Sequence, residues 1–361
     1  MNSKNENPDI VNFLANLSNY EVFTPSKFAI RMLDELPNHI WSNPNIKILD
    51  PSCKTGIFLR EAASRLNKGL KNKIKDDKKR INHILKNQIF GIAITELTSL
   101  VSRRSIYYSR DTNSKFSVCK KFNNGNGNII YNEIQHVWNI KNRCEYCGAT
   151  KVQYSRNKDL EKYAYEFIHT RNPQELFKNM KFDVIIGNPP YHIGDGSGKA
   201  GESFKPIYGL FVEQAMKLKP RYLCMITPSR WFIGGKGLDN FRKNMLNSNN
   251  FRELVHFPIA SEVFSSQGIT GGVSYFLWDS LYDGECNITV KEDYKIVSSS
   301  KRNLNSFGKY LIIRDEEVSI INKVQEVSSK FMNDVVSSRN PFGIKNNNLL
   351  VERKPNSNYL K

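Results

Sequence analysis

The sequence predicts an α/β protein with an open, doubly wound and mostly parallel sheet. Short apolar runs of strand length recur along the chain, and a segment with apolar residues at helical spacing follows most of them. Strands that alternate with helices are typical of such sheets, whose ligands bind at the carboxyl ends of the strands. The chain of 361 residues is long enough for a sizeable core.

Each predicted element has a local reason. A helix is expected at 24–36, because Thr24-Pro25 suits a helix start with proline at the first helical position. The apolar run at 46–50 predicts a strand that enters a turn and then a helix at 57–66. Further strands are expected at 89–94, 182–187 and 222–227, and further helices at 95–105, 208–218 and 315–327.

Two regions interrupt this alternation. Residues 110–160 are polar and carry several cysteine and histidine residues, which indicates an inserted module rather than a loop. After about residue 300 the alternation stops, and the chain ends in a polar segment that contains no element long enough to close a domain.

The charge of the chain has two competing explanations. Lys and Arg number 53 against 35 Asp and Glu, a net charge of +18, which favours a polyanionic partner such as nucleic acid. A bias toward Lys over Arg, with 41 Asn, is equally typical of an AT-rich genome. Residues 51–150 hold 19 basic and 7 acidic residues, so this part is the candidate DNA-facing surface. Within it, the basic run 65–86 is more simply explained as a solvated helix face and loop than as a phosphate contact.

Several classes are excluded. No apolar run approaches the roughly 18 residues of a membrane span, and the N-terminus lacks the apolar run of a secretory signal. The expected location is the cytoplasm, with no membrane partner. Six cysteines at uneven spacing do not form a disulfide framework in a chain of this size, so metal binding or packing explains them better.

The sharpest motif is Asn188-Pro189-Pro190-Tyr191, directly after the strand at 182–187. A proline pair that simply ends a strand is the structural alternative, but it requires neither the asparagine nor the tyrosine. The amino group of adenine is a poor nucleophile because its lone pair is delocalised. The Asn188 side-chain oxygen and the Pro189 carbonyl can hold its two hydrogens and direct that lone pair at a methyl group, while Tyr191 stacks on the base.

The second motif lies at the end of the strand at 46–50. Asp50 ends the strand, the turn from Pro51 to Gly56 brings backbone close to a ligand, and the following helix start offers free amides to a carboxylate. Alone this pattern is weak evidence for a nucleotide-like cofactor. Combined with the downstream Asn-Pro-Pro-Tyr it becomes strong.

With both motifs, residues 18–290 resemble adenine-N6 DNA methyltransferases of the Eco57I-like restriction-modification type. The resemblance implies the Rossmann-like, doubly wound mixed sheet of class I S-adenosyl-L-methionine-dependent methyltransferases. It also implies a catalytic domain at 1–300 and, at 301–361, a linker with the start of an incomplete target-recognition region. The polar insert at 110–160 is expected from its own residues to be a zinc-binding module within the catalytic domain.

The resemblance assigns several further residues. Thr24-Pro25 corresponds to the family motif that holds the methionine carboxylate of the cofactor, and Asp50, Pro51, Ser52 and Gly56 fall on the cofactor loop. Lys54 departs from it, since glycine is usual there. Either the loop adopts a conformation that lysine tolerates, which is favoured because the rest of the loop is intact, or the cofactor pocket is altered.

Three carried-over residues have structural alternatives. Ala93 stands where the family has an acid for the ribose, and Glu96 is the nearest substitute. Glu166 matches the acid that accepts from the cofactor's adenine amino group, although an exposed helix carboxylate is as good an explanation. Phe264 matches the aromatic residue that would stack on the extruded base opposite Tyr191, with a buried core phenylalanine as the alternative.

The insert contains half of a typical zinc knuckle, Cys144-x-x-Cys147. Cys119 and His136 are the expected remaining ligands, and His169 competes for the fourth position. A polar segment with few apolar residues needs a bound metal ion to stabilise a defined structure. Cys53 and Cys224, flanked by apolar residues, are expected to serve packing.

The predicted function is transfer of a methyl group from S-adenosyl-L-methionine to adenine N6 in double-stranded DNA after base flipping. The chain is expected to be the modification part of a restriction-modification system, with a separate recognition or restriction subunit as a further partner. The alternatives are a methyltransferase of RNA or of a protein glutamine, and an inactive or partner-dependent DNA-binding fragment.

Overall fold

The computed structural model describes residues 22–154, 164–193, 204–264, 268–308 and 311–327. The chain divides into two units, Met1–Arg314 and Asp315–Lys361. In the described residues the second unit contains one helix, α9 (Asp315–Val327), at its predicted position. The first unit ends at Arg314 rather than at residue 300, because Leu311 and Ile313 are buried and the Arg302 guanidinium donates to the Ile312 carbonyl (2.7 Å).

One large sheet organises the first unit. Its strands are β1 (Ile48–Cys53), β2 (Ile89–Ala93), β3 (Ile129–Ile130), β4 (Val184–Gly187), β7 (Tyr222–Pro228), β8 (Phe251–Phe257), β9 (Val273–Asp279), β10 (Cys286–Glu292) and β11 (Lys295–Arg302). They lie in the order β11-β10-β8-β9-β7-β4-β1-β2-β3. β5 (His192–Ile193) and β6 (Lys205–Pro206) pair in antiparallel orientation as a separate two-stranded sheet, the β5–β6 hairpin.

The half of the sheet from β3 to β7 is parallel. From β1 the chain moves outward through β2 and β3 and then returns to β4 on the other side of β1. This reversal creates a topological switch point between β1 and β4, the place where open α/β sheets bind ligands. The doubly wound parallel arrangement that the sequence predicts is confirmed, and all four of its predicted strands are present.

The other half of the sheet is mainly antiparallel and was not resolved into strands from the sequence. β9 runs antiparallel to both β7 and β8, and β10 is antiparallel to β11 but parallel to β8. The result is a mixed sheet. Lys295–Arg302 shows why the sequence signal was weak, because most of this edge strand is exposed and lacks a continuous apolar run.

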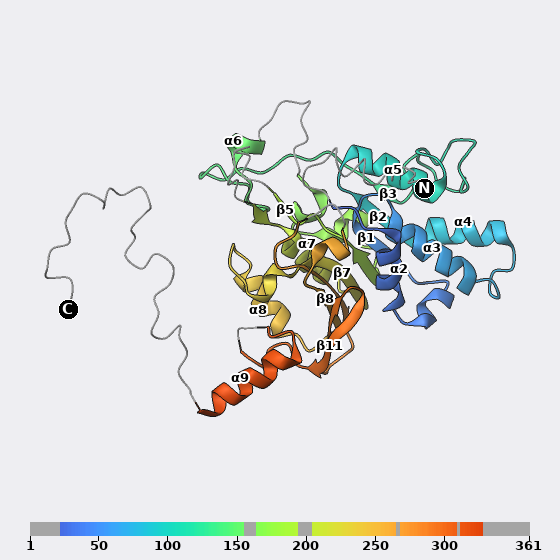
Figure 1. Ribbon diagram of the computed structural model, residues 1–361. Helices are drawn as coiled ribbons and strands as arrows, with labels where there is room; N and C mark the ends of the chain where they lie inside the picture. The colour runs from blue at the N-terminus through green and yellow to red at the C-terminus, as the bar shows by residue number, and fades with distance from the viewer. Residues whose placement is uncertain (1–21, 155–163, 194–203, 265–267, 309–310, 328–361) are drawn as a thin grey trace, which may run out of the picture. The chain divides into compact units, whose positions relative to one another are not determined.

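Helices cover both faces of the sheet. Their bounds are α2 (Ser26–Asp34), α3 (Ile57–Gly69), α4 (Asp77–Asn87), α5 (Glu96–Tyr107), α6 (Lys151–Tyr154), α7 (Tyr208–Lys217) and α8 (Asp239–Leu246), with 3-10 turns η1 (Asn38–Ser42), η2 (Glu166–Ile168), η3 (Pro173–Phe177), η4 (Ser229–Phe232) and η5 (Ala260–Glu262). Neighbouring strand residues point to opposite faces, so Ile48 joins one buried cluster and Leu49 another. The first cluster contains α2 to α5, which lie together in blue and cyan in Figure 1, and the second contains α7 and α8.

The described part of the predicted insert, residues 110–154, packs on the core of the first unit. Cys144, Cys147 and Tyr154 belong to the buried cluster of α7 and α8, whereas Cys119 belongs to that of α2 to α5. The two ends of the insert therefore pack on opposite faces of the sheet. None of the described helices has the length and apolar character needed to cross a membrane.

Candidate functional site

The two sequence motifs meet at the switch point of the sheet. Asp50 lies in β1, and Asn188 directly follows β4, its parallel neighbour. Gly187 makes this approach possible, because a Cβ atom there would lie 2.8 Å from the Asp50 carboxylate oxygen. Asp50 also accepts from the backbone N–H of Ser52 (3.0 Å), which closes the turn after Pro51.

Asp50 is buried in an unusual state for a carboxyl group. Burial raises its pKa to about 7, against the lowering effects of the Ser52 hydrogen bonds and of the Lys54 charge. At neutral pH this carboxyl group therefore gains or loses its proton readily, and a cationic ligand would favour the ionised form.

The turn from Pro51 to Gly56, the predicted cofactor loop, tolerates Lys54 because the positive φ falls on Gly56. Gly56 has a φ of +76° at the start of α3, whereas Lys54 is not among the residues with positive φ. The Lys54 side chain is buried, and its ammonium donates to the Val22 carbonyl (2.8 Å). This geometry agrees with the expectation that the loop adopts a conformation that lysine tolerates. It also places the positive charge of Lys54 at the candidate site.

Two hydrogen bonds from the amide nitrogen orient the Asn188 side chain and leave its oxygen facing away from both partners. Its Nδ2 donates to the Val22 carbonyl (2.9 Å) and to the Thr24 hydroxyl (3.0 Å). Because a backbone carbonyl can only accept, the amide NH₂ must face Val22. The buried Oδ1 then has no hydrogen-bond partner among the residues that the structure describes, so Asn188 offers an acceptor to a ligand.

The helix start at Thr24-Pro25 differs from the prediction by one position. Pro25 is the N-cap and α2 begins at Ser26, with no side-chain hydrogen bond to its first amides. The Thr24 hydroxyl instead accepts from Asn188, 164 residues away. The anchoring carbonyl of Val22 was missed from the sequence, since every residue carries a backbone carbonyl.

These residues enclose a hollow of about 10 Å³, which is room for roughly one water molecule. Its lining is Thr24, Asp50, Ser52, Lys54, Thr55, Gly56, Ile57, Phe58 and Asn188. The donor set fits an amino-acid-like ligand: a carboxyl group, the amides at a helix start, an ammonium and the unpartnered Asn188 oxygen. The hollow is too small for such a ligand as it stands, so part of its lining has to move when the ligand binds.

Tyr191 and Phe264 contact each other rather than enclosing a gap. Their rings lie edge to face, with centroids 6.2 Å apart and an interplanar angle of 69°. Both are buried, and no described residue forms a hydrogen bond with the Tyr191 hydroxyl. The predicted stacking of a base between the two ring faces therefore requires one ring to turn.

The two predicted cofactor carboxylates lie on other segments. Glu96 is exposed in the first turn of α5, next to the carboxyl end of β2. Glu166 lies in η2, where one oxygen accepts from Asn132 (2.8 Å) and the other is buried with no partner in the described segments. Burial raises the pKa of Glu166.

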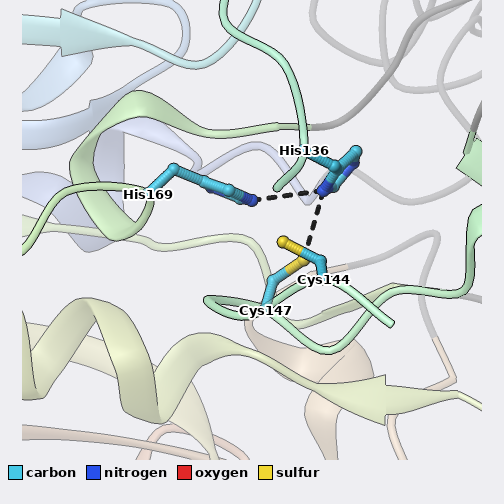
Figure 2. Close-up of side chains that lie close together, drawn as sticks. All are labelled: His136, Cys144, Cys147 and His169. Carbon is cyan, nitrogen blue, oxygen red and sulfur yellow. Dashed lines mark hydrogen bonds between the residues drawn. The ribbon is translucent and has the colours of Figure 1, made fainter. Parts of the chain in front are cut away.

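Four potential metal ligands converge beside η2. His136, Cys144, Cys147 and His169 each offer one ligand atom, and these atoms lie within 4.8 Å of one another (Figure 2). His136 Nδ1 lies 3.2 Å from His169 Nε2 and 3.5 Å from the Cys147 sulfur. Tetrahedral zinc, with bonds of about 2.0 Å to nitrogen and 2.3 Å to sulfur, separates such pairs by about 3.3 and 3.5 Å.

Cys119, predicted as the fourth ligand, does not join this cluster. It is buried among α2 to α5 on the opposite face of the sheet, so the sheet separates it from Cys144 and Cys147. His169, the competing candidate, takes its place. Cys53 and Cys224 are fully buried, as expected for packing residues.

The doubly wound sheet, with a loop-to-helix turn after β1 and Asn-Pro-Pro-Tyr after β4, defines a class I methyltransferase. The family model described as Eco57I restriction-modification methylase matches residues 87–264. A protein of Mycoplasma pneumoniae (strain ATCC 29342 / M129 / Subtype 1) described as "Uncharacterized adenine-specific methylase" is 35% identical over 369 residues, 93% of this chain and 87% of that protein. The chain belongs to the Eco57I restriction-modification methylase family.

Two solved structures of restriction-enzyme proteins are similar to this chain at low sequence identity. The M protein of the type I restriction enzyme EcoKI is 15% identical, with a TM-score of 0.46 over 87% of this chain and 56% of that chain. The type IIG restriction endonuclease BpuSI is 12% identical, with a TM-score of 0.46 over 88% of this chain and 35% of that chain. The present chain thus spans about half or less of the length of these two proteins.

Proposed function

We propose that this chain is a site-specific DNA methyltransferase that transfers the methyl group of S-adenosyl-L-methionine to N6 of adenine, as the modification part of a restriction-modification system. Family membership and the adenine-specific relative support the reaction. The observation that carries it in this chain is the buried Asn188 Oδ1 at the carboxyl end of β4, an acceptor for which the described part of the chain supplies no partner.

The residues after β4 act on the nucleophile. Asn188 Oδ1 and the Pro189 carbonyl accept the two hydrogens of the adenine amino group, and the ring of Pro190 fixes the backbone that aims that carbonyl. The cofactor supplies the electrophilic methyl group. Rotating the base out of the duplex costs a few kcal/mol, which stacking on Tyr191 and Phe264 offsets once one of these rings has turned.

The cofactor site extends from the N-terminal segment across β1 and the start of α5 to η2. The residues that we assign to it are Thr24, Pro25, Asp50, Pro51, Ser52, Gly56, Glu96 and Glu166. The helix start at Gly56 offers amides to the methionine carboxylate, and the Asp50 carboxylate suits its ammonium. Movement of the Lys54 side chain away from the Val22 carbonyl would enlarge the hollow and would let its ammonium pair with the same carboxylate.

A second bound group, zinc, is proposed for the insert. Two cysteine sulfurs and two imidazole nitrogens form the donor set of structural zinc sites, and here they converge from two segments. Buried thiols alone would not require the facing histidine nitrogens.

The proposed partners follow from the reaction. Double-stranded DNA is the substrate, and a separate recognition or restriction subunit is a partner that restriction-modification systems commonly supply. Such an enzyme acts in the cytoplasm, where bacterial DNA is found. Transfer to RNA or to a protein glutamine is the less favoured activity, because the family and the relative are methylases of restriction-modification and adenine-specific type.

The test is radiolabelled methyl transfer to DNA, ribosomal RNA and release factor in parallel. Incorporation into DNA alone supports the proposal. Asn188→Ala is expected to lower transfer by about 100-fold or more, with the circular dichroism spectrum retained. Full transfer by Asn188→Ala, or label only in RNA or protein, would overturn it.

Thr24 provides a finer test of the same site. Thr24→Val keeps the Asn188 oxygen but removes one of the two groups that orient it, so kcat is expected to fall by about 5- to 10-fold, the equivalent of one net hydrogen bond of about 1 kcal/mol. Thr24→Ser keeps the hydroxyl and is the matched control, expected to retain kcat.

A further inference from the structure

The Cys/His cluster lies at a junction of three chain segments. His136, Cys144 and Cys147 come from the insert, and His169 directly follows η2. The third segment is the β5–β6 hairpin, whose Lys205 ammonium donates to the Cys147 carbonyl (2.7 Å). Gly148 makes this last contact possible, because a Cβ atom there would collide with the Lys205 Nζ.

The second segment carries a proposed cofactor residue. His169 Nδ1 is hydrogen-bonded to the Tyr165 carbonyl (2.8 Å), which leaves Nε2 directed at His136. A backbone carbonyl on the far nitrogen is the usual way in which a metal-ligating histidine is oriented. The intervening turn contains Glu166, so fixing His169 also fixes the position of this carboxylate.

The third segment begins at the catalytic motif. β5 starts at His192, directly after Tyr191, and pairs with β6, in which Lys205 lies. The Ile207 amide donates to the Tyr191 carbonyl (3.1 Å). A chain of contacts therefore runs from Cys147 through Lys205 to the backbone of the motif.

The cluster itself is better satisfied by a cation than by protons. His136 Nδ1 faces both His169 Nε2 and the Cys147 sulfur, and it carries at most one hydrogen to share between them. One Zn²⁺ accepts a lone pair from each of the four ligand atoms, and two thiolates balance its charge.

We infer that zinc bound by His136, Cys144, Cys147 and His169 is a clamp that fixes η2 and the β5–β6 hairpin to the insert, and so positions Glu166 and the backbone after Tyr191. The assignment deepens the proposed function, because both positioned segments belong to its cofactor and base sites. The zinc content of the protein, however, is measured independently of any activity.

The first experiment measures bound metal in the purified full chain by plasma mass spectrometry. About one zinc per chain is expected for the wild type and for Cys119→Ser, the matched control, with a large loss in Cys147→Ser and His169→Ala. Cobalt in place of zinc is expected to show tetrahedral visible bands and a thiolate charge-transfer band, the latter weakened in Cys147→Ser. A zinc-free wild type, or equal zinc loss in Cys119→Ser, overturns the site.

The second experiment separates the clamp from the ion. Hydrogen exchange of peptides covering 164–170 and 204–208 is expected to accelerate when a chelator removes zinc, while peptides of β1 and β4 stay protected. Lys205→Met is expected to keep zinc, yet to accelerate exchange at 204–208 and to lower kcat. Unchanged exchange in both peptides after zinc loss overturns the clamp.

The outcomes also separate the clamp from the proposed function. Zinc with the expected exchange response, but no methyl transfer to DNA, sustains the clamp and defeats the function. Methyl transfer by a protein that binds no zinc does the reverse.

Discussion

At Asp50, burial in the sheet shifts the titration of the carboxyl group toward neutral pH. Its pKa is raised from 3.8 to about 7, mainly because burial disfavours the charged form. Between these two values the folded state binds more protons than the unfolded state, so the contribution of Asp50 to the free energy of unfolding falls as pH rises from about 4 to about 7 and is level above.

Asp50→Asn tests this dependence. The free energy of unfolding of the variant relative to the wild type is expected to increase by up to about 1.4 kcal/mol per pH unit across that window. Urea unfolding of both proteins at pH 5, 6, 7 and 8 measures the difference. A difference that does not vary with pH would show that Asp50 is ionised throughout.

For Asn188, the sequence predicted the residue as a site candidate but not the orientation of its side-chain amide. Its place after an apolar strand and before two prolines made it the sharpest candidate. Which of its amide atoms faces the ligand depends on Val22 and Thr24, which lie 166 and 164 residues away. No local pattern encodes that contact, because it arises only when the N-terminal segment crosses the end of β4.

Among the elements, the turn from β1 into α3 depends on one glycine. Gly56 combines a φ of +76° with close packing, since an added Cβ would lie 3.2 Å from the Ser102 Cα and the Ile106 Cδ1. Gly235 has a similar φ of +78° with nothing within 4 Å of that position. Substitutions at these two glycines therefore distinguish the energetic cost of backbone strain from that of steric contact.

Gly235→Ala is expected to cost about 1 kcal/mol of unfolding free energy from the positive φ alone. Gly56→Ala is expected to cost roughly 2 kcal/mol or more, because the neighbouring α5 must also shift, and to weaken S-adenosyl-L-methionine binding. Chemical unfolding and calorimetric titration measure both. Equal stability losses with unchanged cofactor affinity would contradict the role assigned to this turn.

The elements that the sequence predicted are those with strong one-dimensional signals. β1, β4 and β7 are buried along their whole length, and parallel strands covered on both faces appear as continuous apolar runs. In the mainly antiparallel half of the sheet, β8 and β11 contain exposed positions among buried ones, whereas β9 is almost wholly buried and was not delimited although its apolar run has strand length. The signal of β8 and β11 was too weak to delimit strands.

For the whole molecule, the topology separates the basic residues by edge of the sheet. α3 starts at the carboxyl end of β1 and leads away from it, and α4 leads into the start of β2. The basic run 65–86 therefore extends to the amino edge, remote from Asn188. Lys141 and Arg143, exposed in the insert beyond the carboxyl end of β3, are on the catalytic side.

Salt dependence distinguishes these surfaces. Lys141→Gln/Arg143→Gln is expected to weaken duplex binding and to reduce the slope of log affinity against log salt by about 2, one unit per lost phosphate contact. Lys78→Gln/Lys79→Gln, an equal change of charge at the amino edge, is the control and is expected to leave the slope unchanged. Fluorescence anisotropy at 50–200 mM salt measures both, and a larger effect of the control pair would reverse the assignment.

The sequence by itself determined the parallel half of the sheet, the two motifs at its switch point and the family, because each depends on residues adjacent in the chain. Only the tertiary structure decided which distant residues share a face. It placed Cys119 and Cys144 on opposite faces of the sheet and brought His169 to the cluster instead. It also joined Thr24 to Asn188 and carried the basic run 65–86 away from the catalytic edge, since these contacts follow from strand order, which spacing along the chain does not specify.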